Sequence, residues 1–84
     1  MTVLVSQLDN EYASKCVRIF ANGKQVGHVG PGESFLVKTD AVPATILAVC
    51  GFCSAQATMH ADGELSIRWS INAPYIELAP GKGR

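Results

Sequence analysis

Charged residues are scarce in this chain, and neither sign is in excess. The 84 residues include seven Lys and Arg against seven Asp and Glu, so that charged residues make up 17% of the sequence. An average soluble chain carries about 25%. Neither sign is gathered into a run. Because binding to phosphates requires concentrated Lys and Arg, this composition argues against a nucleic-acid partner.

Long apolar segments and a basic leader are also missing. No apolar run approaches the roughly 20 residues that cross a bilayer. The opening Met1–Val5 contains no basic residue and is soon followed by Asp9 and Glu11, so we expect no signal peptide. The three cysteines cannot all pair within the chain, whereas small secreted domains usually carry an even number. We therefore predict a cytoplasmic protein that does not bind a membrane.

A recognisable catalytic set is absent as well. Gly27, Gly30 and Gly32 suggest a phosphate loop, but no Gly-Lys-Ser/Thr follows them, so we interpret them as turn residues. His28 and His60 are expected at surface or turn positions, and no two carboxylates stand out as general acid and base. We predict a protein that is not an enzyme and that uses no cofactor or metal.

Turn signals are abundant in this chain. Asn22-Gly23 fits a type I′ turn, and Pro31-Gly32 fits a type II turn. Asp62-Gly63 is a further hairpin signal. No segment keeps apolar residues at helical spacing over three turns, and residues 10–15 are expected to form at most a single helical turn. These features predict an antiparallel meander.

Alternating apolar residues between the turns predict the strands. The main predicted segments are Cys16–Ala21, Lys24–Val29, Ser34–Lys38, Ala44–Cys50, Ser54–His60 and Glu64–Asn72. An edge strand or docked arm at residues 3–6 and a short last strand at residues 76–78 flank them. The unbroken apolar run Ile46–Val49 is typical of a strand covered on both faces. Trp69 shares the apolar side of its strand and is expected in the core.

Together these segments predict a single all-β domain. The expected fold is a small antiparallel β-sandwich or barrel of six to seven short strands linked by hairpins. A chain of this length buries only about 60% of its unfolded surface, which leaves room for one core. We expect the domain to span residues 1–79 and residues 80–84 to form a flexible tail.

The spacing of Cys50 and Cys53 is the one motif that suggests chemistry. Two such cysteines can flank a hairpin turn, close a reversible disulfide or supply half of a metal site. In thioredoxin-like enzymes the first cysteine opens a helix, whereas this motif lies between two predicted strands. A structural role is therefore the simplest interpretation, with a redox pair as the alternative. Cys16 is expected in the core.

A polar face with little charge is predicted from the second half of the chain. If the strands on either side of Asp62-Gly63 pair as a hairpin, one row of side chains on each strand points outward on the same side. That face comprises Gln56, Thr58, Arg68, Ser70 and Asn72. Such a face suits contact with another protein.

The run VRIFANGKQVG at residues 17–27, followed by Pro31-Gly32-Glu33, resembles the opening of PEGA-like domains, which are small bacterial β-sandwiches. In that family a V-x-I-x-x-N-G-K-x-V-G hairpin precedes a P-G-E turn. The resemblance covers about a third of the chain and continues loosely through residues 48–54. It implies a non-catalytic accessory or binding module and assigns no site residues.

The leading functional prediction is a non-enzymatic module that binds another protein. It would act through an edge strand or the polar sheet face, and an edge strand would also allow a homodimer. A sharper version is a phage or mobile-element inhibitor, anti-CRISPR-like, that occludes a surface of a host defence complex. The alternative from another class is a thiol redox or metal-binding protein that uses Cys50 and Cys53.

Overall fold

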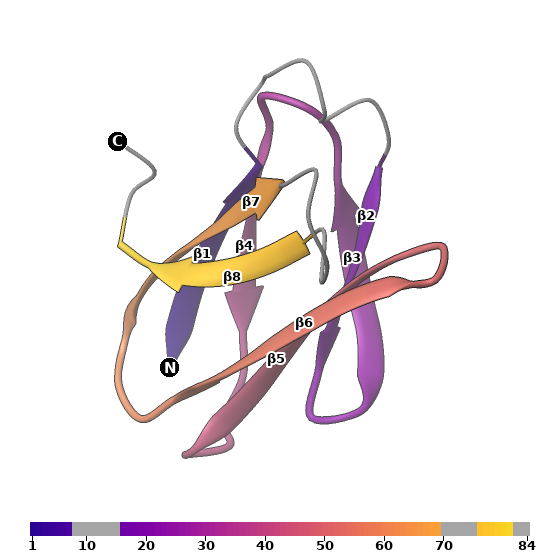
Figure 1. Cartoon of the computed structure of the whole chain (residues 1–84). Coiled ribbons are helices and arrows are strands. Elements are labelled where there is room, and N and C mark those ends of the chain that lie inside the picture. Colours follow the sequence, from indigo (N-terminus) through magenta and orange to yellow (C-terminus); the bar gives the residue numbers. More distant parts are fainter. Residues whose placement is uncertain (8–15, 70–75, 82–84) are drawn as a thin grey trace.

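The computed structural model describes residues 1–7, 16–69 and 76–81, which form eight β-strands and no helix (Figure 1). The strands are β1 (Thr2–Gln7), β2 (Val17–Ala21), β3 (Lys24–Val29), β4 (Ser34–Lys38), β5 (Ala44–Cys50), β6 (Cys53–Met59), β7 (Gly63–Trp69) and β8 (Ile76–Pro80). The all-β prediction is confirmed. The described residues hold one strand more than the six to seven expected, because the first and last segments both form full strands.

The strands form two sheets of four that pack face to face. Sheet A has the order β4-β1-β7-β8, and sheet B has the order β3-β2-β5-β6. At one side of the sandwich β6 packs against β8, and at the other side β3 packs against β4. This arrangement is the predicted β-sandwich (Figure 1).

The first strand lies inside sheet A rather than at an edge. β1 pairs antiparallel with β4 and parallel with β7, in a register that runs from Val3 opposite Gly63 to Gln7 opposite Ile67. The prediction that the first strand lies at a sheet edge is therefore wrong. The prediction of a purely antiparallel meander is wrong as well, because β1 and β7 are parallel. The side chains of Val3 and Val5 are fully buried, as suits a central strand.

Asp62-Gly63 does not close a hairpin. β6 pairs only with β5, and β7 pairs with β1 and β8, so the link between β6 and β7 carries the chain from sheet B to sheet A. The Asp62 side chain accepts a hydrogen bond from the Thr2 backbone N–H at 2.8 Å. Asp62 thus bonds the link between β6 and β7 to the start of β1.

The other two turn predictions are confirmed. Asn22 and Gly23 both have positive φ, 52° and 85°, as the type I′ turn between β2 and β3 requires. Gly32 has φ of 74°, and the Glu33 N–H donates to the Gly30 carbonyl at 3.0 Å, which matches a type II turn. The Asn22 side chain also accepts a hydrogen bond from the Thr45 N–H, which joins this turn to β5.

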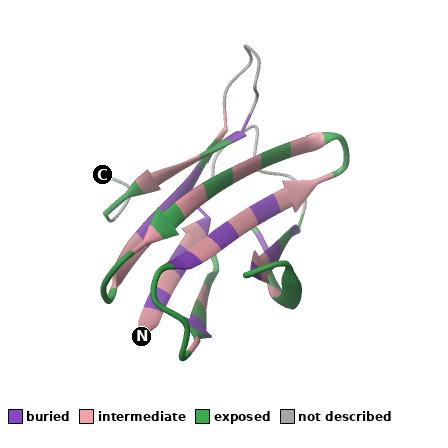
Figure 2. Ribbon diagram, turned by 90° about the horizontal axis from the view of Figure 1, so that it is seen from below, coloured by how far each residue is buried: buried purple, intermediate pink, exposed green. Residues whose placement is uncertain are grey.

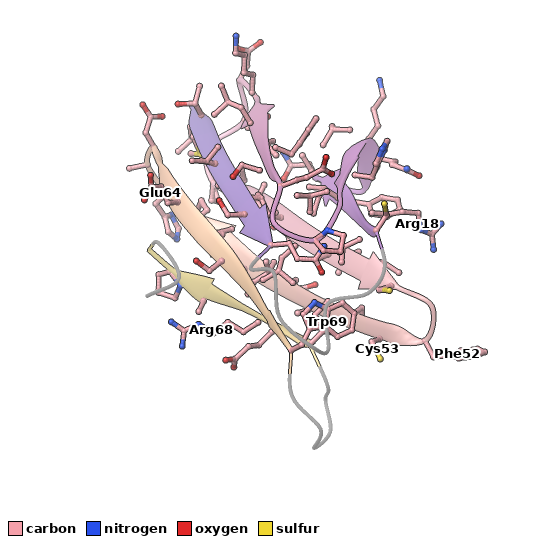
Figure 3. The ribbon with its side chains drawn as sticks, turned by 90° about the horizontal axis from the view of Figure 1, so that it is seen from above. Arg18, Phe52, Cys53, Glu64, Arg68 and Trp69 are labelled. Atoms are coloured by element: carbon pink, nitrogen blue, oxygen red, sulfur yellow. The ribbon has the colours of Figure 1, made fainter. Side chains whose placement is uncertain are left out.

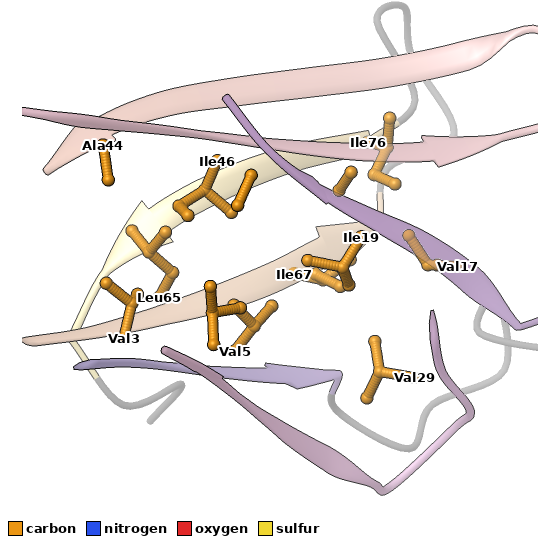
Figure 4. Packing of buried hydrophobic residues seen from close by; sticks show 13 residues of the cluster. Val3, Val5, Val17, Ile19, Val29, Ala44, Ile46, Leu65, Ile67 and Ile76 are labelled. Atoms are coloured by element: carbon orange, nitrogen blue, oxygen red, sulfur yellow. The ribbon is translucent and has the colours of Figure 1, made fainter. Parts of the chain in front are cut away.

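The core consists of aliphatic side chains that alternate along the strands and point between the sheets (Figure 4). The buried hydrophobic residues are Val3, Val5, Val17, Ile19, Ala21, Val29, Val37, Ala44, Ile46, Ala48, Leu65, Ile67 and Ile76. Along β5 buried residues alternate with partly exposed ones, and along β6 partly exposed residues alternate with exposed ones (Figure 2). Trp69 packs against the core, as predicted, but is only partly buried.

Gln7 forms a polar centre at one end of this core. Its side chain is 1% exposed. The amide nitrogen donates to the Val29 carbonyl at 2.9 Å, and the amide oxygen accepts from the indole N–H of Trp69 at 2.7 Å. The Gln7 backbone is bonded to the turn before β4, with its N–H donating to Glu33 and its carbonyl accepting from Gly32. One residue thus joins β1, β3, β7 and a turn.

Gly27 is not the turn residue that the sequence predicts, because it lies within β3 opposite Ile19. Its missing side chain makes room for the ring of Phe35, which reaches over from β4. A Cβ atom at Gly27 would lie 2.6 Å from Cε1 and 2.9 Å from Cε2 of that ring. The Phe35 ring of sheet A thus packs against the Gly27 backbone of sheet B, at the side of the sandwich where β3 and β4 meet.

The C-terminal end of the described chain is bonded to sheet A. Pro80 belongs to β8, opposite Leu65, and the Gly81 N–H donates to the Glu64 carbonyl at 2.8 Å. The buried Ser66 hydroxyl donates to the Gly81 carbonyl at 2.6 Å. Residues 80 and 81 of the predicted tail are therefore attached to the domain. The rest of that tail and the predicted helical turn at residues 10–15 lie outside the described residues.

Candidate functional site

The hairpin of β5 and β6 carries the most exposed large hydrophobic side chain in the described part of the chain. Its strands pair over seven positions, from Ala44 opposite Met59 to Cys50 opposite Cys53. Gly51 has φ of 61°, and Phe52 next to it is fully exposed, at 109%. Figure 3 shows the Phe52 side chain directed away from the body of the molecule.

Cys50 and Cys53 flank this two-residue turn directly opposite each other. Both are free thiols, partly buried, and pack against the core from the inward side of the hairpin. Cys16 is free as well, but it precedes β2 and is exposed, so its predicted place in the core is wrong. No group of three His, Cys, Asp or Glu side chains suited to a metal ion occurs in the described residues.

The outer face of sheet B, meaning its side away from sheet A, is built from two rows of side chains that cross all four strands. Residues directly opposite each other in antiparallel strands share a face, so the pairing registers define these rows. The first row is His28, Arg18, Val49 and Ser54. The second row is Gln25, Phe20, Leu47 and Gln56. Thr45 and Thr58 lie beside the second row.

The centre of this face is apolar and only partly covered. Phe20, Leu47 and Val49 are neighbours on β2 and β5, and all three are partly exposed. The run Ile46–Val49 predicts a strand covered on both faces, and this is wrong on the outer side. Only the inward-facing Ile46 and Ala48 are fully buried. The sequence shows that this run is apolar. It does not show that the outer side of the run is partly exposed.

The charges on the strands of sheet B all have the same sign. The charged residues of these four strands are Arg18 and Lys24, and the strands contain no Asp or Glu. The Arg18 guanidinium lies over the Phe20 ring, with its central carbon 5.9 Å from the ring centroid. This distance is within the range of a cation–π interaction. Arg18 and Phe52 lie toward one side of the molecule, and Glu64 and Arg68 of sheet A lie toward another (Figure 3).

The polar contact face expected from the sequence is not a single surface. Gln56 and Thr58 lie on the outer face of sheet B, whereas Arg68 lies on β7 in sheet A, opposite Glu77. The prediction is wrong because β6 and β7 do not pair. The other two predicted members, Ser70 and Asn72, lie outside the described residues.

Both histidines are exposed, as expected. His28 belongs to the outer face of sheet B beside Arg18, and His60 follows the end of β6. No helix in the described part of the chain is long and apolar enough to span a bilayer. Comparison with protein-family models, with curated proteins and with solved structures finds no match, so the PEGA-like resemblance stays a prediction.

Proposed function

We propose that this chain is a non-enzymatic module that binds another protein through the outer face of sheet B. The observation that supports this most directly is the apolar group Phe20, Leu47 and Val49, which lies at the centre of an open sheet face. Polar side chains, among them Gln25 and Gln56, surround it. Interfaces typically combine an apolar centre with a polar rim, and Arg and aromatic residues are enriched in them.

A sheet face is a better candidate than an edge strand. β6 packs against β8 and β3 packs against β4, so the edges of the two sheets lie against each other. The pairing of β3 with β2 is also irregular: Ile19 of β2 is opposite Gly27, but Phe20 is opposite Gln25, and bulges of this kind hinder edge-to-edge pairing. An inhibitor that occludes a surface of a host defence complex would be a special case of the same mode of binding.

The substitution Leu47→Asp tests this proposal. It places a charge in the apolar centre and should weaken capture of a partner from native lysate by about 30-fold, as expected for a hot spot. The matched control is Leu36→Asp, which makes the same change at a leucine that is 47% exposed on β4 in sheet A. Leu36→Asp should leave capture unchanged, and thermal melting should show that both variants fold.

Equal capture by wild type and Leu47→Asp would overturn the proposal. So would equal loss in both leucine variants, because binding would then not depend on the sheet B face. Phe52→Ser, at the turn beside this face, should give an intermediate loss if the hairpin tip borders the interface.

A second candidate function is a reversible thiol pair, and the register of Cys50 opposite Cys53 favours it. Directly opposed residues in antiparallel strands have Cα atoms about 4.5 to 5.5 Å apart, which is within the range of disulfides. In exchange with oxidised glutathione, the two thiols would be oxidised to a disulfide while the glutathione disulfide is reduced to two thiols.

Thiol titration in denaturant tests this second candidate. After incubation with oxidised glutathione and removal of the reagent, a redox pair should leave Cys50 and Cys53 untitratable and without added glutathione mass, whether or not the exposed Cys16 forms a mixed disulfide, and dithiothreitol should restore all three thiols. In the Cys50→Ser variant, Cys53 should form no internal disulfide. Three titratable thiols after oxidation would exclude the redox function and leave the cysteines with a structural role.

A further inference from the structure

We infer that the partner presents carboxylates next to apolar side chains, and that Arg18 binds one of these carboxylates. This inference rests on the proposed function, because it concerns the same outer face of sheet B. Its basis is the chemistry of that face, which combines an apolar centre with positive charge and contains no acidic side chain on its strands.

The charge distribution is the first step of the argument. Although the whole chain has no net charge, Arg18 and Lys24 are the only charged residues in the four strands of sheet B, and only Arg18 lies in the rows of the outer face, because Lys24 is opposite the inward-facing Ala21. The strands of sheet A, by contrast, carry both signs, with Glu64 and Glu77 against Lys38 and Arg68. A surface with charge of one sign favours a partner of the opposite sign and disfavours a like-charged one.

The setting of Arg18 is the second step. Its exposed side chain lies in the first row, between His28 and Val49, and directly beside the apolar centre. Within the described part of the chain, its guanidinium contacts the Phe20 ring and forms no ion pair. This position over the ring leaves the N–H groups of the guanidinium available for a bidentate bond to a carboxylate. If apolar side chains of a partner contact Leu47, a neighbouring carboxylate of that partner lies within reach of the Arg18 guanidinium.

An acidic protein segment suits this face better than a nucleic acid. Single-stranded nucleic acids are bound by several aromatic rings and a groove rich in Lys and Arg. Here the centre of the face is largely aliphatic, through Leu47 and Val49, and Arg18 is the one Lys or Arg residue in the rows of the face. Aliphatic side chains offer little for base stacking, whereas they suit the apolar side chains of a protein.

A phage-displayed library of random peptides, panned on the full chain, tests the inference. Wild type should enrich peptides in which Asp or Glu neighbours an apolar residue. Arg18→Glu should bind these peptides at least about tenfold more weakly and should enrich peptides with Lys or Arg instead. Arg18→Gln serves as the neutral control and should fall between the two. Binding of a selected acidic peptide to wild type should also weaken with added salt.

The outcomes separate this inference from the proposed function. Peptides that require Leu47 but show no acidic enrichment, or that bind Arg18→Glu as well as wild type, overturn the role of Arg18 and leave the binding face intact. Binders that are unaffected by Leu47→Asp overturn both. If a fluorescent oligouridylate binds wild type but not Arg18→Glu, the inference of an acidic protein segment is overturned and the partner is a nucleic acid.

Discussion

Replacing Gln7 by alanine is expected to lower the free energy of unfolding by about 3 to 5 kcal/mol. The truncated side chain no longer accepts the Trp69 indole N–H or donates to the Val29 carbonyl. Each buried group left without a partner costs about 1 to 3 kcal/mol, and the lost volume adds a cavity. A typical domain is stable by only about 5 to 15 kcal/mol, so this change removes a large share of the total.

Urea unfolding measures this effect. Trp69 is the single tryptophan of the chain, so its fluorescence reports on the site itself, and circular dichroism follows the sheets independently. The matched control is Gln56→Ala, which removes the same side chain from an exposed position on the outer face of sheet B. Gln56→Ala should change the free energy of unfolding by less than about 0.5 kcal/mol.

A double-mutant cycle with Trp69→Phe shows whether the hydrogen bond carries the effect. Once the indole N–H is absent, Gln7→Ala no longer leaves that partly buried donor without its acceptor. The double variant should therefore lose at least about 1 kcal/mol less than the sum of the single variants. Strict additivity, or a Gln7→Ala loss close to that of Gln56→Ala, would contradict the assigned role of Gln7.

Gly27→Ala is expected to destabilise the protein by about 2 to 3 kcal/mol, although it adds only one methyl group. The added Cβ would overlap the ring of Phe35, with Cε1 at 2.6 Å and Cε2 at 2.9 Å. Phe35 is partly buried against the core, so its ring cannot move without disturbing the contact between the two sheets. The cost should appear in urea unfolding as a lower transition midpoint with an unchanged slope.

Phe35→Leu should rescue this substitution, because the shorter side chain leaves space for a methyl group. In the Phe35→Leu background, Gly27→Ala should cost less than about 0.5 kcal/mol. Gly63→Ala is the matched control, since the one atom that its Cβ would crowd is the terminal methyl of Met59, at 2.8 Å, while the Ala61 carbonyl oxygen would lie at an ordinary contact distance of 4.0 Å. That flexible side chain can move aside, so the loss should be smaller than at Gly27. An equal loss at both glycines, or no rescue, would show that Phe35 is not the cause.

The sequence predicts the local structure of this protein well, because turn chemistry and alternation act over short distances. The bounds of β3, β4 and β5 agree with the predicted segments. The positive φ values at Asn22-Gly23 and at Gly32 are those that the turn residues imply. Strand pairing was harder to predict. Nothing near Val3 or Asp62-Gly63 in the sequence indicates that β1 will pair in parallel with β7, because partners so far apart are selected by packing of the whole core.

The candidate site was predictable only in part, for the same reason. The sequence predicts Gln56 and Thr58 on an exposed sheet face, and both are exposed, but a face shared with Arg68 needs a hairpin that does not form. Leu47 and Val49 stand out as apolar in the sequence, yet the pattern of residues along one strand does not show whether anything covers its second face. The group with Phe20 emerges only from the register between β2 and β5.

The central position of β1 also has a consequence for how the chain folds during synthesis. β2, β3, β5 and β6 all lie within residues 17–59, so sheet B can assemble while the later strands are still being made. β1 is made before them but finds its second neighbour only when β7 follows, and Gln7 bonds to a tryptophan 62 positions away. Contacts over such separations close slowly. On the ribosome we therefore expect the N-terminal strand to complete its pairing late, after all four strands of the sheet that we assign to binding have been made.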